Sequence, residues 1–128
     1  MRTEQEEKNL QLVRRMYVDV LDRTDSSAVD AMFDPGYIQH NPNIASGSRS
    51  LKEMLDRARA KYPQVKHDVK RMIADGDLVA AHVHVVFEPG TPGFATVDIY
   101  RIVGNKIVEH WDVMQPVPLD PKNDNGMF

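Results

Sequence analysis

The helical patterns of this chain all precede Pro63, and its long strand patterns all follow it. Before Pro63, apolar residues recur at helical spacing over residues 4–22 and 50–62, with a short helix predicted between them. After Pro63, alternating or β-branched runs predict four strands, at residues 65–73, 78–87, 95–103 and 106–114. This order favours an α+β fold, in which a curved, mostly antiparallel sheet packs on three N-terminal helices.

The ends of the predicted helices carry recognisable signals. Ser26 or Ser27 can cap the short second helix, and the Asp34-Pro35-Gly36 sequence ends it. Ser50 and Glu53 have the spacing of a capping box, which predicts that the third helix opens there. The face of the first helix that should enter the core is formed by Leu10, Val13, Met16, Tyr17, Val20 and Leu21.

The length of 128 residues suits one domain, which we place at residues 1–128 with an irregular tail over 116–128. The net charge of −3 argues against a nucleic-acid partner. The absence of cysteine excludes disulfides, thiol nucleophiles and cysteine-held metal clusters. The longest apolar run falls short of the ~20 residues of a membrane span, and residues 1–9 lack the apolar core of a signal peptide. These features predict a cytoplasmic protein that does not associate with membranes.

Polar residues share faces of the predicted strands, because strand side chains alternate. The same-face pairs are His82 with His84, Asp98 with Tyr100, and His110 with Asp112. A solvated sheet face explains such pairs as well as a site does. His67, between two charged residues, is expected to face solvent. Val65, Val69 and Ile73 are expected on one face of the first long strand.

Strand register decides whether these faces coincide. If His84 pairs with Asp98, then His82 meets Tyr100 on the same face. A two-residue turn at Gly104-Asn105 would set Asp98 opposite Trp111, whereas a three-residue turn with a bulge would put Asp98, His110 and Asp112 on one face. The sequence does not choose between these closures.

Four stretches of this chain resemble the SnoaL-like polyketide cyclases, and in particular the branch described as SnoaL-like aldol-condensation enzymes. The stretches are residues 37–42, 75–80, 97–102 and 104–112. The resemblance implies the cystatin-like cone of the ketosteroid-isomerase superfold, with a pocket between sheet and helices. It also implies a homodimer through the outer sheet face, where Val97, Ile99, Trp111 and Val113 alternate away from Asp98 and Asp112.

The resemblance also implies a site. Asp112 matches the general acid/base of the SnoaL-like cyclases, and Asp98 stands where the polyketide cyclase has a second pocket residue, a histidine. With no metal and no organic cofactor, two carboxylates can divide the base and acid roles. We expect Asp112, Asp98 and His40 to be catalytic, and His82, His84, His110 and Tyr100 to bind the substrate.

Three functions remain open from the sequence. The first is a cofactor-free lyase or isomerase that carries out an intramolecular aldol condensation, or a related isomerisation, of a small carbonyl compound. The second is a non-catalytic, ligand-binding dimer on the same fold. The third is a metal-dependent enzyme in which His82 and His84 bind the ion with His40, His110 or a carboxylate.

Overall fold

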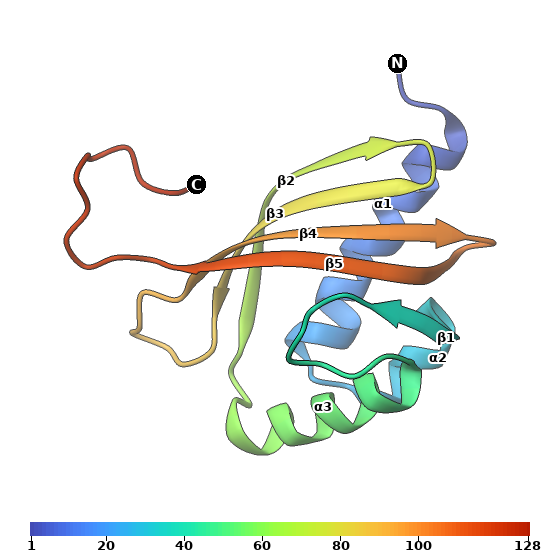
Figure 1. Cartoon of the computed structure of the whole chain (residues 1–128), viewed down its shortest axis with the longest axis horizontal. Helices are drawn as coiled ribbons and strands as arrows, with labels where there is room; N and C mark the ends of the chain where they lie inside the picture. The colour runs from blue at the N-terminus through green and yellow to red at the C-terminus, as the bar shows by residue number, and fades with distance from the viewer.

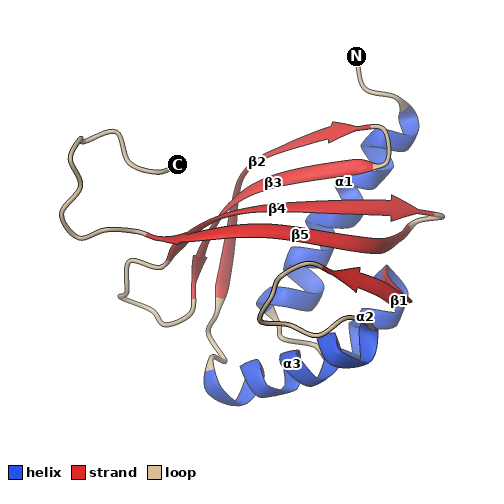
Figure 2. Ribbon diagram, in the orientation of Figure 1, coloured by secondary structure: helices blue, strands red, loops and turns tan.

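A computed structural model describes all residues, 1–128, and contains a helical layer and one five-stranded sheet (Figure 2). The helices are α1 (Glu4–Met16), α2 (Val29–Met32) and α3 (Ser48–Lys61). The strands are β1 (Phe33–Gln39), β2 (Lys66–Asp75), β3 (Leu78–Val86), β4 (Phe94–Val103) and β5 (Lys106–Pro116). Two shorter helical segments follow α1, a π-helical continuation at Tyr17–Asp22 and a 3₁₀ turn at Ser26–Ala28. The predicted α+β class, with helices before the long strands, is confirmed.

The strand order is β1-β5-β4-β3-β2, with β2 to β5 forming an antiparallel meander and β1 pairing parallel to β5. Figure 1 shows α1 behind the curved long strands and α3 across their lower end, beside β1. None of the helices has the length and apolar character that crossing a bilayer requires.

The core forms between α1 and the concave face of the sheet. Val13, Met16 and Val20 are fully buried on the helical side, and Val79 and Val83 are fully buried on β3. Burying these side chains supplies the main driving force for folding. Because strand side chains alternate, His82 and His84, which lie between the buried residues of β3, point to the outer face of the sheet.

The starts of the two longer helices differ in how they are capped. Thr3 and Glu6 form a capping box at the start of α1, with the Thr3 hydroxyl accepting from the Glu6 amide and the Glu6 carboxylate accepting from the Thr3 amide. The box predicted at Ser50 and Glu53 does not form, because α3 begins earlier, at Ser48, after Gly47. Gly47 has a φ of 93°, a conformation that glycine adopts without strain.

A bulge in β2 changes which residues face the core. Val69 pairs with Val83 and Arg71 pairs with His82, so Lys70 is the extra residue. The bulge shifts the alternation by one, and Ile73 is therefore 66% exposed rather than on the core face. Before the bulge, His67 points inward, so the expectation that it faces solvent was wrong.

The β4–β5 hairpin combines features of both predicted closures. Gly104 and Asn105 both have positive φ and form a two-residue turn that pairs Val103 with Lys106. The register then shifts, because Ile102 pairs with Ile107 while Arg101 pairs with Glu109, which leaves Val108 as a bulged residue. The bulge lies beyond the turn rather than within it, and it sets Asp98 opposite Asp112.

The C-terminal residues after β5 are irregular and fold back to the outer face of the sheet. The Phe128 ring stacks on His84 and His82, with ring centroids 4.4 and 5.5 Å away, and the Lys70 ammonium lies 5.4 Å from its centroid. The last residue of the chain therefore covers part of the outer face of β2 and β3.

Candidate active site

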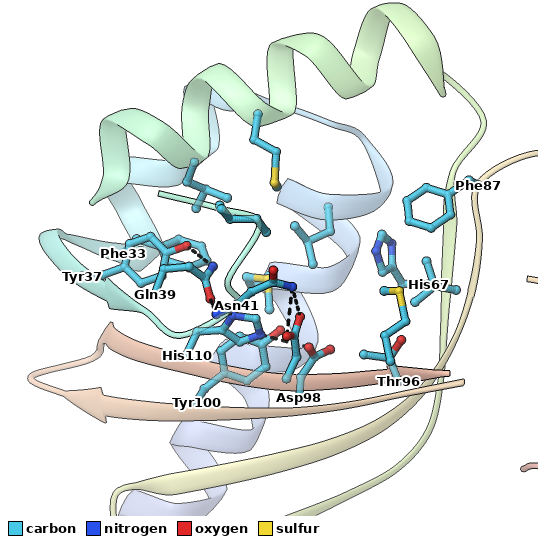
Figure 3. A pocket seen from close by; sticks show the side chains of 18 residues that line it. Phe33, Tyr37, Gln39, Asn41, His67, Phe87, Thr96, Asp98, Tyr100 and His110 are labelled. Carbon is cyan, nitrogen blue, oxygen red and sulfur yellow. Dashed lines mark hydrogen bonds and ion pairs between the residues drawn. The ribbon is translucent and has the colours of Figure 1, made fainter. Parts of the chain in front are cut away.

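A cavity of about 190 Å³ lies between the concave face of the sheet and the helices. Most of its lining is apolar, and α3 and the loop before it contribute Ile44, Leu51 and Met54. Polar side chains from β1, β4 and β5 and from the loop after β1 lie together in this lining, among them Asp98, His110 and Asp112 (Figure 3). An apolar pocket with a few convergent polar groups is the usual form of a small-molecule site.

Asp98 is a buried carboxylate with hydrogen-bond donors on both oxygens. It is 6% exposed, accepts from the Tyr17 hydroxyl at 2.5 Å, and is hydrogen-bonded to Nε2 of His110 at 2.9 Å. The Tyr100 hydroxyl donates in turn to the Tyr17 oxygen at 3.0 Å. Since charge-assisted bonds are the strong ones, these donors hold Asp98 in a fixed position.

The network assigns the proton on the other nitrogen of His110. The Gln39 side-chain oxygen accepts from the Asn41 amide, and the Gln39 side-chain nitrogen donates to the Tyr37 hydroxyl. The same Gln39 oxygen lies 2.7 Å from Nδ1 of His110, which must therefore donate. Nε2 then shares a single proton with Asp98, and the imidazole is fixed at both ends.

Asp112 has a more open environment than Asp98. It is half-buried, and its only hydrogen-bond donor is the Asn41 side-chain amide, which contacts both carboxylate oxygens at 2.9 and 3.0 Å. A carboxylate has about four acceptor positions, so Asp112 retains lone pairs that face the pocket. Asn41 also links the two carboxylates, Asp98 and Asp112. Its backbone amide donates to the Gln39 side-chain oxygen, which contacts His110, and its side-chain amide donates to Asp112.

The tyrosines of the site remain protonated over a wide pH range. Burial, and then the neighbouring Tyr100 and Asp98, raises the pKa of Tyr17 well above its usual value. Burial, followed by the Asp98 charge, does the same to the pKa of Tyr100. Burial raises the pKa of Tyr37 to about 12 despite the opposing Gln39 hydrogen bond. All three phenols therefore act as hydrogen-bond donors or neutral acceptors, not as bases.

Two further polar residues, His67 and Thr96, line the cavity (Figure 3). Nδ1 of His67 lies 2.9 Å from Oδ1 of Asp22, and the same oxygen accepts from the His67 backbone amide. This contact leaves Nε2 of His67 without a hydrogen-bond partner in the protein. Thr96 is 3% exposed, and its hydroxyl oxygen makes no hydrogen bond.

Asp98, His110 and Asp112 also have the composition of a metal site. One ligand atom from each lies within 4.8 Å of the other two. Both ring nitrogens of His110 are held by Gln39 and Asp98, and both oxygens of Asp98 have donors. A metal ion would have to displace these bonds, so the arrangement favours proton transfer over metal binding.

The structure brings together four of the seven residues expected at the site. Asp98, Tyr100, His110 and Asp112 all line the cavity. Asp98 and Asp112 belong to one hydrogen-bonded network that includes His110. The bulge at Val108 is what sets both carboxylates on the concave face.

The other three expected residues lie on the outer face of the sheet, which corrects their placement. His40 follows Gln39 in an extended segment and so points the opposite way. It stacks on Trp111 at 4.9 Å and contacts Glu109 at 2.7 Å. His84 pairs with Ala95 and His82 with Val97, not with Asp98 and Tyr100. The supposed metal site of His82 and His84 therefore lacks both carboxylates and His110.

Several polar groups of the site were not predicted from the sequence. Tyr17 was recognised only as a core residue of the first helix, and nothing local indicates that its hydroxyl meets a carboxylate 81 residues away. Gln39 and Asn41 lie within the stretch that carried the family resemblance, which is the one signal that could have identified them.

The comparisons with known proteins agree with this geometry. A family model described as the SnoaL-like domain matches residues 13–110. No match was found among curated protein sequences.

Among solved structures, a SnoaL-like polyketide cyclase from Agrobacterium tumefaciens superposes with a TM-score of 0.69 at 17% identity, covering 90% of this chain and 93% of that one. A protein named as a proposed polyketide cyclase from Bacillus cereus gives a TM-score of 0.75 at 17% identity, with 89% and 78% covered. AclR from Streptomyces galilaeus, named as a proposed hydroxylase, superposes with a TM-score of 0.70 at 22% identity, covering 89% of this chain and 83% of that one.

Structural similarity at these low sequence identities establishes the fold alone, and the activities named for these solved structures differ. The sequence match, in contrast, covers most of the chain. The expected resemblance is therefore confirmed, and this chain belongs to the family of SnoaL-like domain proteins.

Proposed function

We propose that this protein is a cofactor-free acid/base enzyme that removes a proton from the carbon next to a carbonyl group of a small substrate and carries the resulting enolate into an intramolecular aldol condensation or an isomerisation. The observation that carries the proposal is the pair of unlike carboxylates in one apolar pocket. Asp98 is buried with donors on both oxygens, whereas Asp112 keeps free lone pairs toward the cavity. Environments that differ in this way separate the roles of two carboxylates.

Asp112 is the base in this proposal. It takes the α-proton and becomes a carboxylic acid while the substrate becomes an enolate. The side-chain amide of Asn41, which already contacts Asp112, has a second N–H that can donate to the enolate oxygen. In the condensation, the enolate carbon then attacks a second carbonyl of the same molecule, and the new alkoxide takes a proton back from Asp112.

Asp98 acts through His110 in this scheme. The chain from Gln39 through His110 to Asp98 holds the imidazole in one orientation beside Asp112. Tyr17 stabilises the Asp98 carboxylate as a neutral donor, and Tyr100 donates in turn to the Tyr17 oxygen. Asp98 and Gln39 are therefore positioning residues, and Asp112 is the catalytic residue.

The size of the cavity restricts the substrate. A dry cavity of about 150 Å³ accommodates benzene, and pockets for drug-sized ligands start near 300 Å³. A cavity of about 190 Å³ therefore supports a ligand with one ring or a short chain. The cavity volume thus favours a small ketone over a fused polycyclic compound.

The test is exchange of α-hydrogens for deuterium, which needs no knowledge of the product. Acetophenone and cyclohexanone are incubated with the purified protein in D₂O, and loss of the α-proton signal is followed by NMR against a buffer blank. Exchange well above the blank, unchanged after dialysis against a chelator, supports the proposal. Binding of the ketones without exchange favours the alternative of a non-catalytic binding protein, and exchange lost on chelation favours a metal-dependent site at Asp98, His110 and Asp112.

We also propose that the protein forms a homodimer through the outer face of the sheet. Val97 and Val113 are 41% and 75% exposed there, and exposed apolar groups on a sheet face favour a partner. Trp111 contributes less than its size suggests, because His40 stacks on the indole and the Arg101 guanidinium lies 5.7 Å from its centroid.

A further inference from the structure

Thr96 carries the one buried side-chain polar atom of the protein that has no hydrogen-bond partner. The residue is 3% exposed, lies on the same face of β4 as Asp98, and lines the cavity (Figure 3). Buried polar atoms in proteins nearly always have a partner, so an exception at a cavity wall needs an explanation.

Packing alone does not explain a threonine at this position. Its neighbours across the sheet in the same row are Val83 on β3 and Met114 on β5, and Val69 follows Val83 on β2. Thr96 is the single polar member of that row. Valine has the same shape as threonine and would fill the space without burying a hydroxyl group.

Since the hydroxyl is buried without a partner in the protein and belongs to a residue that lines the cavity, we infer that Thr96 is a substrate-binding residue, and that the substrate carries a second oxygen function, a hydroxyl or a carbonyl, in addition to the carbonyl group that reacts. This inference rests on the proposed function for the identity of the reacting group. It adds a residue that recognises the second oxygen function, which the removal of the α-proton does not need.

Strand geometry sets the separation of the two oxygen functions. Thr96 pairs with Met114, so the base Asp112 lies diagonally across from Thr96, two residues before Met114 on β5, at a Cα separation of about 7–8 Å. A para-substituted phenyl ketone, with its oxygen substituent across the ring from the acyl group, spans a length of this order. Such a compound also matches the cavity volume of about 190 Å³. The substrate class is therefore a compact hydroxyketone or diketone with its oxygen functions at opposite ends.

The experiment compares acetophenone with 4-hydroxyacetophenone, which differ by one hydroxyl group. Dissociation constants are measured by NMR titration for the wild type, Thr96→Val and Thr96→Ser. The wild type should bind the hydroxylated ketone about three- to tenfold more tightly, the range expected for one neutral hydrogen bond. Thr96→Val should lose this preference while its affinity for acetophenone stays unchanged, and Thr96→Ser should keep it.

Thermal unfolding provides the second measurement. Because Thr96→Val removes an unsatisfied hydroxyl and keeps the shape of the side chain, the variant should unfold at a temperature equal to or above that of the wild type. A clearly lower unfolding temperature would mean that the hydroxyl has a partner in the free protein, and it would overturn the inference.

The binding assay separates this inference from the proposed function. Equal affinity of the wild type for the two ketones, an unchanged preference in Thr96→Val, or no binding of either ketone would overturn the role of Thr96 or the substrate class. A Thr96-dependent preference without α-hydrogen exchange would leave the binding role standing and refute the catalytic proposal. Exchange of α-hydrogens without a preference for the hydroxylated ketone would leave the catalytic proposal standing and refute the role of Thr96.

Discussion

The hydroxyl group of Tyr17 donates a 2.5 Å hydrogen bond to Oδ2 of Asp98, and this bond joins the π-helical continuation of α1 to β4 inside the core. Tyr17 is 1% exposed and Asp98 is 6% exposed, so water does not replace the bond if it is lost. A buried carboxylate thus depends on a donor supplied from another part of the fold.

Tyr17→Phe should lower the free energy of unfolding by about 1–3 kcal/mol, because it leaves a buried carboxylate oxygen without its donor. Chemical denaturation followed by circular dichroism measures the change. Tyr62→Phe is the matched control, since the Tyr62 hydroxyl makes no side-chain hydrogen bond and its loss should have little effect. Equal stability of Tyr17→Phe and the wild type would show that Asp98 does not need this donor.

The buried tyrosines make the fold sensitive to high pH. An unfolded chain ionises its tyrosines near pH 10, whereas the pKa of Tyr37 is about 12 in the folded protein and those of Tyr17 and Tyr100 are raised well above the usual value. Above about pH 10 the folded state therefore holds more protons than the unfolded state. Stability that is fully present below that pH is lost as the pH rises toward the folded-state values.

The free energy of unfolding should fall by roughly 1.4 kcal/mol per pH unit for each tyrosine that stays protonated only in the folded state. Urea unfolding at several pH values between about 9 and 12 gives this slope. Tyr37→Phe should make the slope shallower than in the wild type. A stability that does not change over this range would contradict the burial argument.

The fixed orientation of His110 is testable by spectroscopy. Nδ1 must donate to the Gln39 oxygen, so ¹⁵N NMR of the wild type should show a protonated, slowly exchanging Nδ1. Gln39→Met removes the acceptor, and this proton should then exchange rapidly with water. An unprotonated Nδ1 in the wild type would reverse the assignment of the network.

The proposed homodimer depends on apolar contacts of the outer sheet face. Val113→Asp should shift the protein from dimer to monomer in sedimentation velocity, because it replaces a 75% exposed apolar side chain of that face with a charge. Val103→Asp is the control, since Val103 is 57% exposed but lies at the hairpin end of β4. A wild type that sediments as a monomer at micromolar concentration would refute the dimer.

The fold was largely predictable, because periodicity reports directly on which side of a helix or strand is buried. The predicted turn at Gly104-Asn105 and the alternation of β3 both match the structure. The bulge at Lys70 was not predicted, because an extra residue in a strand has no sequence signature of its own. A bulge in the β4–β5 hairpin was one of the two predicted closures, but it lies at Val108 and not within the turn. The first bulge exposes Ile73, and the second aligns Asp98 with Asp112.

The site was less predictable than the fold for a related reason. The alternation put His82 and His84 on one face of their strand, but only the register across β3 and β4 reveals that this face is the outer one. The family resemblance selected Asp98 and Asp112, and the pocket includes both. Long-range partners such as Tyr17 required the three-dimensional packing.

The most direct test of the account is the rate of α-hydrogen exchange in acetophenone by Asp112→Asn, compared with the wild type and with Asp19→Asn, a substitution outside the pocket. Asparagine keeps the shape of the side chain but cannot take the proton. We predict that Asp112→Asn binds the ketone and retains the fold while exchange slows by roughly a hundredfold or more, with Asp19→Asn unchanged. Exchange by Asp112→Asn at the wild-type rate would show that Asp112 is not the base and would contradict the account.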